Sequence, residues 1–211
     1  LSPDPQPGNW LRTGPEARRL FVRQYSGDWS KTRSASYEIH CDGVDGAEPP
    51  LTLARLEAGL ERTAAFVGSA PPFWTGISEY WRGHAVNEIV PQEVADTRTD
   101  VTVPSGHRFA CGYFELAADE ALLVEFEPVE VPYWGMDLTS YWYEPLHWPG
   151  ARSNVNNASA VRDADGAVRI RIGDSPGDAA NWLDTDGPRE GTVVFRWSRT
   201  HEPVPGFRTR V

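Results

Sequence analysis

Asn181-Trp-Leu-Asp-Thr-Asp-Gly-Pro-Arg-Glu-Gly-Thr-Val-Val-Phe-Arg-Trp197 is the stretch that most constrains the fold of this chain. Its middle, Asp184 to Gly187, combines short polar side chains with a glycine and predicts a turn. Its end, Thr192 to Trp197, is a β-branched and aromatic run of the kind that strands favour. A similar stretch, Asn9-Trp-Leu-Arg-Thr-Gly-Pro-Glu-Ala-Arg-Arg-Leu-Phe-Val-Arg-Gln-Tyr25, lies near the start of the chain. This agreement, with one extra residue in the second copy, indicates a duplicated turn-and-strand unit.

Trp10 and Trp182 follow the asparagine of each copy. A tryptophan at this place can close the end of a hydrophobic core while its indole N–H reaches a loop carbonyl. The alternative is a ring that stacks on a ligand. We expect the structural role, because large aromatic side chains are usually buried for packing.

The composition favours short strands joined by tight turns. The 211 residues include nine tryptophans, 19 glycines and 18 prolines, which suits a β protein better than a helical bundle. Two amphipathic helices are expected in the middle, residues 53–68 and 70–83, with Pro71 and Pro72 in the first turn of the second. The predicted fold is therefore mainly β, an antiparallel jelly-roll-like β-sandwich with a two-helix insertion.

The predicted domain organisation follows the same changes of pattern. Residues 1–48 are expected to be the end of a first, incomplete β half, 49–92 a helical segment and 93–211 a C-terminal β-sandwich. The strands expected besides Thr192 to Trp197 include 19–25, 35–40, 97–103, 108–116 and 121–126, and a hairpin of 160–165 with 167–172.

The charge of the chain argues against two classes of partner. Thirty acidic residues against 20 lysines and arginines give a formal net charge of -10. An acidic chain without a basic stripe is a poor binder of nucleic acids and anionic membranes, so neither is expected.

No apolar run reaches the length of a membrane span, and the N-terminus has no signal-peptide pattern. With only Cys41 and Cys111, the alternatives are a disulfide between them or two free buried thiols; we expect the free thiols and a cytoplasmic protein.

The histidines and glycines show no established catalytic or metal-binding spacing. His-x-His, His-x-x-x-His, the Gly-x-Ser-x-Gly elbow, the P-loop and the Rossmann fingerprint are all absent. We therefore expect no cofactor and no metal, although a metal site assembled across strands, as in some sandwiches, stays open.

The longest strand pattern runs from Tyr133 to Glu144. One face is expected in the core and carries Trp134, Met136, Leu138 and Trp142. The other face is mixed and could line a pocket; it carries Tyr133, Asp137, Thr139, Tyr141 and Tyr143.

Several motifs between Arg108 and Trp197 resemble those of a known family. They are Gly112-Tyr-Phe-Glu-Leu-Ala-Ala-Asp-Glu-Ala-Leu122, Tyr133-Trp134 with Leu138 and Trp142, Asn156 with Asp165-Gly166, and Asp174, Pro176-Gly177 and Asn181-Trp-Leu-Asp-Thr. Together they are similar to the bacterial family called domain of unknown function 1214, which is often paired with domain of unknown function 1254. The resemblance implies sandwich halves and no assigned activity. Pro145-Leu-His-Trp148 departs from the pattern, since His147 stands where an aspartate is expected.

The resemblance also implies partners for this chain. Members of the family have further strands before the segment that corresponds to Gly8-Asn-Trp-Leu. We therefore expect the chain to be the C-terminal part of a longer polypeptide or one chain of a nicked pair, because a missing neighbour would expose a sheet edge. The expected partners are an N-terminal companion chain or upstream segment, a small-molecule ligand and a second copy in a homo-oligomer.

Three function hypotheses stay open at this point. The first is a small-molecule-binding β-sandwich protein with an aromatic-lined pocket, because rings beside a few polar groups suit such ligands. The second is an acid/base enzyme of hydrolase or lyase type acting on a small organic substrate. The third is a structural assembly subunit.

The enzyme and binding hypotheses have candidate residues. The candidate catalytic residues are Asp137, Glu144 and His147, since a carboxylate among rings has a raised pKa suited to proton transfer. The plainer interpretation of Asp137 and Glu144 is a salt bridge, for instance to Arg169 or Arg196. The candidate ligand-binding residues are Tyr133, Tyr141, Tyr143, Trp148, Asn156 and Asn181.

Overall fold

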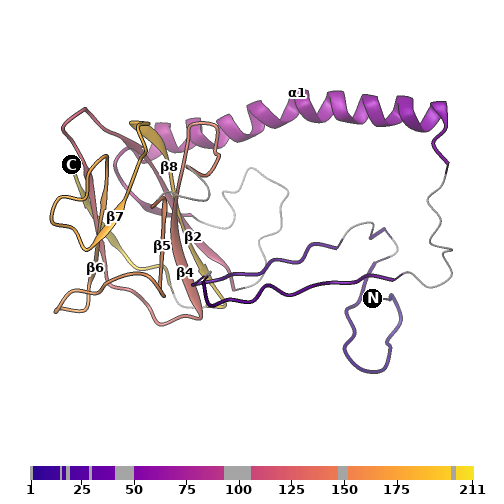
Figure 1. Ribbon diagram of the computed structural model, residues 1–211, viewed down its shortest axis with the longest axis horizontal. Helices are drawn as coiled ribbons and strands as arrows, with labels where there is room; N and C mark the ends of the chain where they lie inside the picture. Colours follow the sequence, from indigo (N-terminus) through magenta and orange to yellow (C-terminus); the bar gives the residue numbers. More distant parts are fainter. Residues whose placement is uncertain are drawn as a thin grey trace. The chain divides into compact units, whose positions relative to one another are not determined.

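The computed structural model describes residues 2–14, 16–17, 20–28, 30–40, 50–92, 106–146, 152–200 and 203–211. The chain divides into two compact units, Leu1–Tyr37 and Glu38–Val211. Within the described residues, all the helices and strands belong to the second unit (Figure 1).

Two β-sheets form the body of the second unit (Figure 1). One has five strands in the order β1-β2-β8-β4-β5, and the other has four in the order β7-β6-β3-β9. Neighbouring strands are antiparallel, except that β6 and β7 run parallel. The strands are β1 (Val90–Gln92), β2 (Arg108–Glu115), β3 (Leu122–Phe126), β4 (Tyr133–Thr139), β5 (Asn154–Asn156), β6 (Val168–Ile172), β7 (Asn181–Leu183), β8 (Glu190–Ser198) and β9 (Phe207–Arg210).

Alternation of side chains directs one face of each strand into a shared core. In β3, Leu122, Val124 and Phe126 are buried, whereas the two residues between them face outward. The run Val168-Arg-Ile-Arg-Ile172 of β6 alternates in the same way. Buried residues of both sheets belong to one apolar cluster, so the prediction of a mainly β sandwich is confirmed.

Phe195 of β8 lies at the centre of an aromatic group in this core. Its ring centroid lies 4.1 Å from that of Trp197, 4.9 Å from Phe126, 5.3 Å from Phe207 and 5.4 Å from Trp134. Phe126 meets it edge-on, while the two indoles stack against it. Because Phe126 and Phe207 come from the four-stranded sheet, the group joins the two sheets.

One continuous helix, α1 (Leu53–His84), stands where two helices were expected. The Thr52 hydroxyl caps it by accepting the N–H of Arg55 at 3.3 Å. Pro71 and Pro72 lie inside the helix and leave the carbonyls of residues 67 and 68 without amide donors. Both of those residues are exposed, so water can bond their carbonyls and the helix continues.

Only the C-terminal third of α1 is buried against the five-stranded sheet. Its buried residues are Ser78 and Trp81, and the Ser78 hydroxyl lies 3.2 Å from that of Thr192 on β8. Trp81 belongs to a second apolar cluster with Ala85, Cys111, Tyr113 and Val194. Among the described residues, no helix has the combined length and apolarity that crossing a membrane requires.

Cys111 is a buried free thiol in this second cluster. Burial raises its pKa to about 12, so the reactive thiolate is scarce near neutral pH. Cys41, the other cysteine, lies outside the described residues.

Several predicted strands differ from the structure. No strand forms among the described residues of 19–25 or 35–40, and 160–165 ends in a turn instead of forming the first arm of a hairpin. A strand needs a neighbour for its peptide groups. In the last case the Asn181 side chain bonds both peptide groups of Val161, replacing a partner strand. The predicted strand 97–103 lies outside the described residues.

Trp142 also departs from the predicted pattern. β4 ends at Thr139, and in the turn that follows Tyr143 takes a φ of 62°. The alternation of faces stops there, so Trp142 is 56% exposed instead of lying in the core. The other residues predicted for that face, Trp134, Met136 and Leu138, are buried.

The tryptophans of the two similar stretches make the same kind of hydrogen bond. In the first unit, Trp10 donates its indole N–H to the carbonyl of Ser2 at 3.1 Å. In the second unit, Trp182 donates to the carbonyl of Gly173 at 2.7 Å. Each bond closes a loop beside a parallel pairing, Ser2 with Arg12 in one unit and β6 with β7 in the other.

Candidate functional site

The outward face of β3, β6 and β9 carries a regular array of arginines. β3 is the middle strand of the three and presents Leu123 and Glu125 outward. The flanking strands place two arginines beside each of these residues: Arg169 and Arg208 beside Glu125, and Arg171 and Arg210 beside Leu123. The face therefore has two rows, which differ in charge balance.

The row through Glu125 is neutralised by ion pairs. Arg169 Nε donates to Glu125 Oε2 at 2.7 Å, and Arg208 Nη2 donates to Glu125 Oε1. Arg169 also donates to Asp163 at 2.6 Å and to Asp165 at 2.7 Å. The bond from Arg169, followed by that from Arg208, holds the pKa of Glu125 below its ordinary value. Bonds to Asp165, Asp163 and Glu125 raise the pKa of Arg169.

Glu125→Gln is expected to flatten the acid dependence of stability. The pKa of Glu125 is lowered in the folded chain from its ordinary 4.5, so the ionised group stabilises the fold above that value. This contribution is lost as the pH falls through the lowered pKa. The free energy of unfolding should therefore fall more steeply in the wild type than in the variant from about pH 5 to about pH 3. Urea unfolding across this window measures both slopes.

The control is Glu57→Gln, which removes a carboxylate from the exposed surface of α1. It should leave the slope of the wild type unchanged. If the free energy of unfolding changed equally steeply with pH in Glu125→Gln and in the wild type, the ion pairs of Glu125 would not stabilise the fold.

The row through Leu123 has no carboxylate. Arg171 Nε donates to the carbonyl of Ser175 at 2.9 Å, which holds the guanidinium beside the loop before β7 and leaves both Nη groups for other partners. Neither Arg171 nor Arg210 forms an ion pair with any residue that the structure describes. Two uncompensated arginines thus flank one apolar side chain in a chain of net charge -10.

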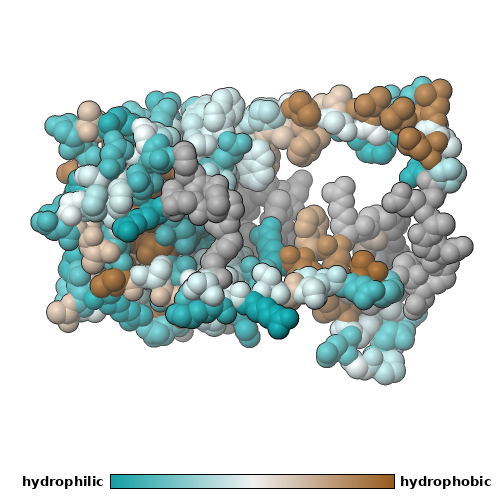
Figure 2. Space-filling view, viewed as in Figure 1, coloured by the Kyte–Doolittle hydropathy of each residue, from teal (hydrophilic) through white to brown (hydrophobic). Residues whose placement is uncertain are grey.

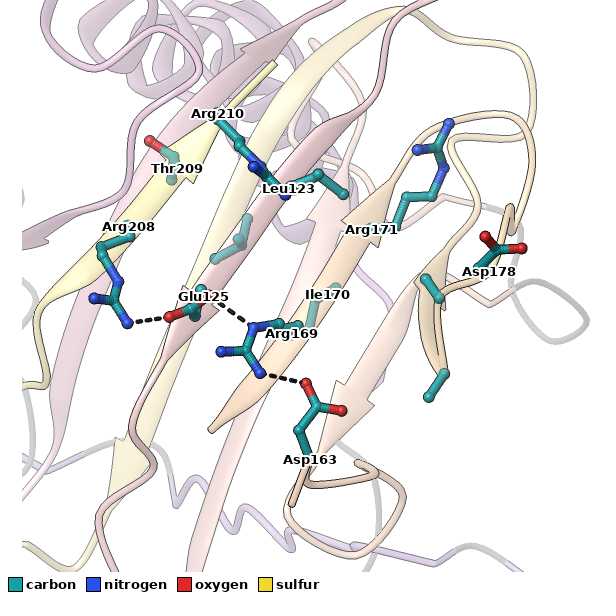
Figure 3. A pocket seen from close by; sticks show the side chains of 13 residues that line it. Leu123, Glu125, Asp163, Arg169, Ile170, Arg171, Asp178, Arg208, Thr209 and Arg210 are labelled. Atoms are coloured by element: carbon teal, nitrogen blue, oxygen red, sulfur yellow. Dashed lines mark hydrogen bonds and ion pairs between the residues drawn. The ribbon is translucent and has the colours of Figure 1, made fainter. Parts of the chain in front are cut away.

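The two rows line a cavity of about 550 Å³ (Figure 3). In Figure 3, Arg171 and Arg210 project from strands on opposite sides of Leu123, and Asp178 stands at the rim beyond Arg171. Residues 178–180 of the loop between β6 and β7 complete the lining. The volume falls in the range of about 300–1,000 Å³ that is typical of small-molecule sites.

A repeated pattern in the sequence indicates the paired arginines of this face, although not the face itself. Both β6 and β9 contain Arg-x-Arg, as Arg169-Ile-Arg171 and Arg208-Thr-Arg210. Because side chains two apart in a strand share a face, each pair must lie on one side of its sheet. The sequence does not indicate that β6 and β9 both pair with β3, because these strands are distant from one another in the chain.

Asp137 and Glu144, the described candidate catalytic residues, lie outside this cavity. Asp137 Oδ2 is 3.5 Å from Arg196 Nε, and its Oδ1 accepts a hydrogen bond from Asn154 at 2.6 Å. Asp137 therefore takes the ion pair with Arg196 that was its structural alternative. Glu144 is exposed at the end of the turn, and no interaction joins it to Asp137 within the described residues.

Tyr141 and Tyr143 contact α1. The Tyr141 hydroxyl donates to Glu79 Oε1 at 2.7 Å, and the Tyr143 ring stacks on Trp74 at a centroid distance of 5.5 Å. The bond to Glu79 raises the pKa of Tyr141, and burial raises that of Tyr143. These two rings fasten the turn after β4 to the helix.

Asn156 and Asn181 are buried and bond the neighbouring main chain. Asn181 accepts the N–H of Val161 at 2.7 Å and donates to the carbonyls of Val161 and Arg169 at 2.8 and 2.9 Å. Asn156 accepts the N–H of Ala158 at 2.9 Å. Both amides thus have structural bonds that leave little capacity for a ligand.

The remaining predicted site residues are not brought together by the described structure. Tyr133 is half-buried at the start of β4, and His147 and Trp148 lie outside the described residues. Within the described ranges, no group of three or more histidine, cysteine, aspartate or glutamate side chains is arranged to hold a metal ion.

Comparison with known proteins gives a structural likeness without a function. No family model and no curated protein matches the chain. A crystal structure of an uncharacterized protein from Burkholderia cenocepacia is 33% identical, with a TM-score of 0.71, over 79% of this chain and 46% of the other. A structure from Vibrio parahaemolyticus is 11% identical, with a TM-score of 0.42, over 80% and 48% of the two chains. This chain thus spans about half the length of each.

Proposed function

We propose that this chain is a small-molecule-binding β-sandwich protein whose ligand is a small organic anion. The ligand's acidic group would lie between Arg171 and Arg210, with its apolar part over Leu123. The observation that carries the proposal is the pair of arginines without carboxylate partners at one end of the 550 Å³ cavity. This location replaces the aromatic strand as the proposed binding face.

The geometry of the sheet supports convergence of the two arginines on one group. β6 and β9 lie one strand to each side of β3, so the backbones that carry Arg171 and Arg210 are about 10 Å apart. Long arginine side chains can close that distance, and a planar guanidinium binds a carboxylate or a phosphate through two parallel hydrogen bonds. Leu123 between them supplies an apolar floor.

Arg171→Gln and Arg210→Gln are each expected to weaken binding of an aliphatic carboxylate by about tenfold or more, since one charge-assisted hydrogen bond contributes about 1.5–3 kcal/mol. Isothermal titration calorimetry with acetate, hexanoate, benzoate and inorganic phosphate measures the loss. Hexanoate and benzoate should bind more tightly than acetate, because they cover Leu123 as well.

The matched control is Arg62→Gln, which removes the same charge from the exposed surface of α1. It should leave the affinity unchanged. An equal loss of affinity in this control would mean that the arginines act only through the net charge of the chain, and it would contradict a site between Arg171 and Arg210. If none of the four probes binds at millimolar concentration, the proposal is refuted.

Finer predictions from the sequence stay proposals. The likeness to the Burkholderia cenocepacia protein supports a shared fold and leaves membership of the domain of unknown function 1214 family as an inference. The matching indole bonds of Trp10 and Trp182 support duplication of one unit. The jelly-roll order of the strands and a companion for the first unit remain predictions.

A further inference from the structure

Apolar side chains recur along α1 at two positions of a seven-residue repeat, with Thr63 as a polar member of the set. One position of the repeat holds Leu53, Leu60, Val67, Trp74 and Trp81; the position three residues later holds Leu56, Thr63, Ala70 and Ile77. An apolar seam with this spacing is the pattern by which two helices pack side by side.

The described structure covers only one end of this seam. Trp81 is 5% exposed because it packs on the five-stranded sheet. Leu53, Leu60 and Val67 are 71%, 61% and 62% exposed. Figure 2 shows the corresponding apolar surface along the helix away from the sheets. We refer to residues 53–70 as the projecting segment.

The projecting segment is poorly suited to stand alone in water. It contains Gly59 and Gly68, and it leads directly into Pro71 and Pro72. Glycine and proline are the residues least favourable to a helix interior, and most of the stability of helices in proteins comes from packing of an apolar face. Its helical state therefore depends on packing, and the seam is the surface available for it.

We propose that the projecting segment pairs with the same segment of a second copy of this chain, in antiparallel orientation. The stripe that already packs on the sheet at Trp81 leads into the exposed seam, in which Thr63 is a polar position, so one face of the helix serves both contacts. The C-terminal third of each helix carries its own sandwich, and antiparallel pairing puts the two sandwiches at opposite ends. A parallel pair would bring them together at one end.

The charges of the projecting segment permit self-association. Arg55 and Arg62 balance Glu57 and Glu61, so two copies of the segment meet without net repulsion. The segment is about 27 Å long, a short contact that belongs with weak, concentration-dependent interfaces. Because each whole chain carries a net charge of -10, added salt should strengthen the pairing by screening the repulsion between copies.

Sedimentation equilibrium of the 211-residue chain over roughly 1–200 μM tests the pairing. The wild type should show a monomer–dimer equilibrium that Leu60→Glu weakens at least tenfold. Leu60 is exposed within one chain, so near-ultraviolet circular dichroism, which reports the packed aromatic core of the sandwich, should be unchanged for this variant. Ala65→Glu, on the opposite face of the same helix, should dimerise like the wild type.

Cysteine cross-linking tests the orientation. In a Cys41→Ser background, a mixture of Leu56→Cys and Val67→Cys chains should form mixed disulfide dimers, whereas either variant alone should not. Cross-linking of each variant with itself would indicate a parallel pair and contradict the proposed orientation. A monomer at every concentration, or a dimer that Leu60→Glu leaves intact, would overturn the proposal and assign the seam to another partner or to no partner.

Discussion

Gly112→Ala is expected to prevent the chain from folding stably. Gly112 lies buried in β2 beside the segment that follows α1. That segment bonds the neighbouring Tyr113 through the carbonyl of Ala85 and the N–H of Asn87. A methyl group at Gly112 would overlap the carbonyl oxygen of Glu88 and lie 3.0 Å from its carbonyl carbon. Both are backbone atoms, so the segment after α1 would have to move and lose its bonds to β2.

The expected loss of several kcal/mol is comparable with the total stability of an ordinary domain, about 5–15 kcal/mol. Urea unfolding, or expression in soluble form if the variant does not fold, measures it. Gly76→Ala is the control, because nothing lies within 4 Å of the added methyl group and the site is in a helix. That change should stabilise the chain by up to about 1 kcal/mol. Wild-type stability in Gly112→Ala would contradict the close approach of the Glu88 backbone to Gly112.

Phe195→Ala is expected to reduce the free energy of unfolding by about 3–5 kcal/mol. Phe195 is fully buried, and its ring contacts aromatic side chains of both sheets. The stacked indoles of Trp134 and Trp197 are too rigid to fill the space that the ring leaves, so a cavity should remain.

Equilibrium unfolding in urea, followed by near-ultraviolet circular dichroism, measures this loss. Phe21→Ala removes the same side chain from a position that is 78% exposed, and it should change stability by no more than about 0.5 kcal/mol. A loss below about 1 kcal/mol for Phe195→Ala would mean that the two sheets do not meet at this ring.

The strands that were predicted correctly have two features. Their apolar residues alternate, and the second unit contains partner strands that pair with them. Thr192 to Trp197 lies within β8, and Ala121 to Phe126 contains β3, because both bury one face in the core. Leu20 to Val22 has a similar apolar run and forms no strand; these side chains are 49–78% exposed. Local propensity was alike in these segments, and the partner strands made the difference.

The candidate site could not be predicted for a related reason. The pattern from Tyr133 to Glu144 predicted a pocket because its aromatic and polar residues are close together in the sequence. The cavity is assembled from β3, β6 and β9, whose order depends on pairing between segments up to about eighty positions apart. Leu123 gains its two arginine neighbours only through that pairing, and no local pattern encodes it.

The burial of Trp134 and Trp197 provides an optical signal for the sandwich. Both side chains are 1% exposed, and neither indole N–H has a hydrogen-bond partner in the described part of the chain. Indoles in such dry surroundings fluoresce at short wavelengths, whereas Trp142, which is 56% exposed, is expected to emit like an indole in water. A red shift of emission would therefore report entry of water between the sheets, and the spectrum of the native chain should contain a distinct blue component.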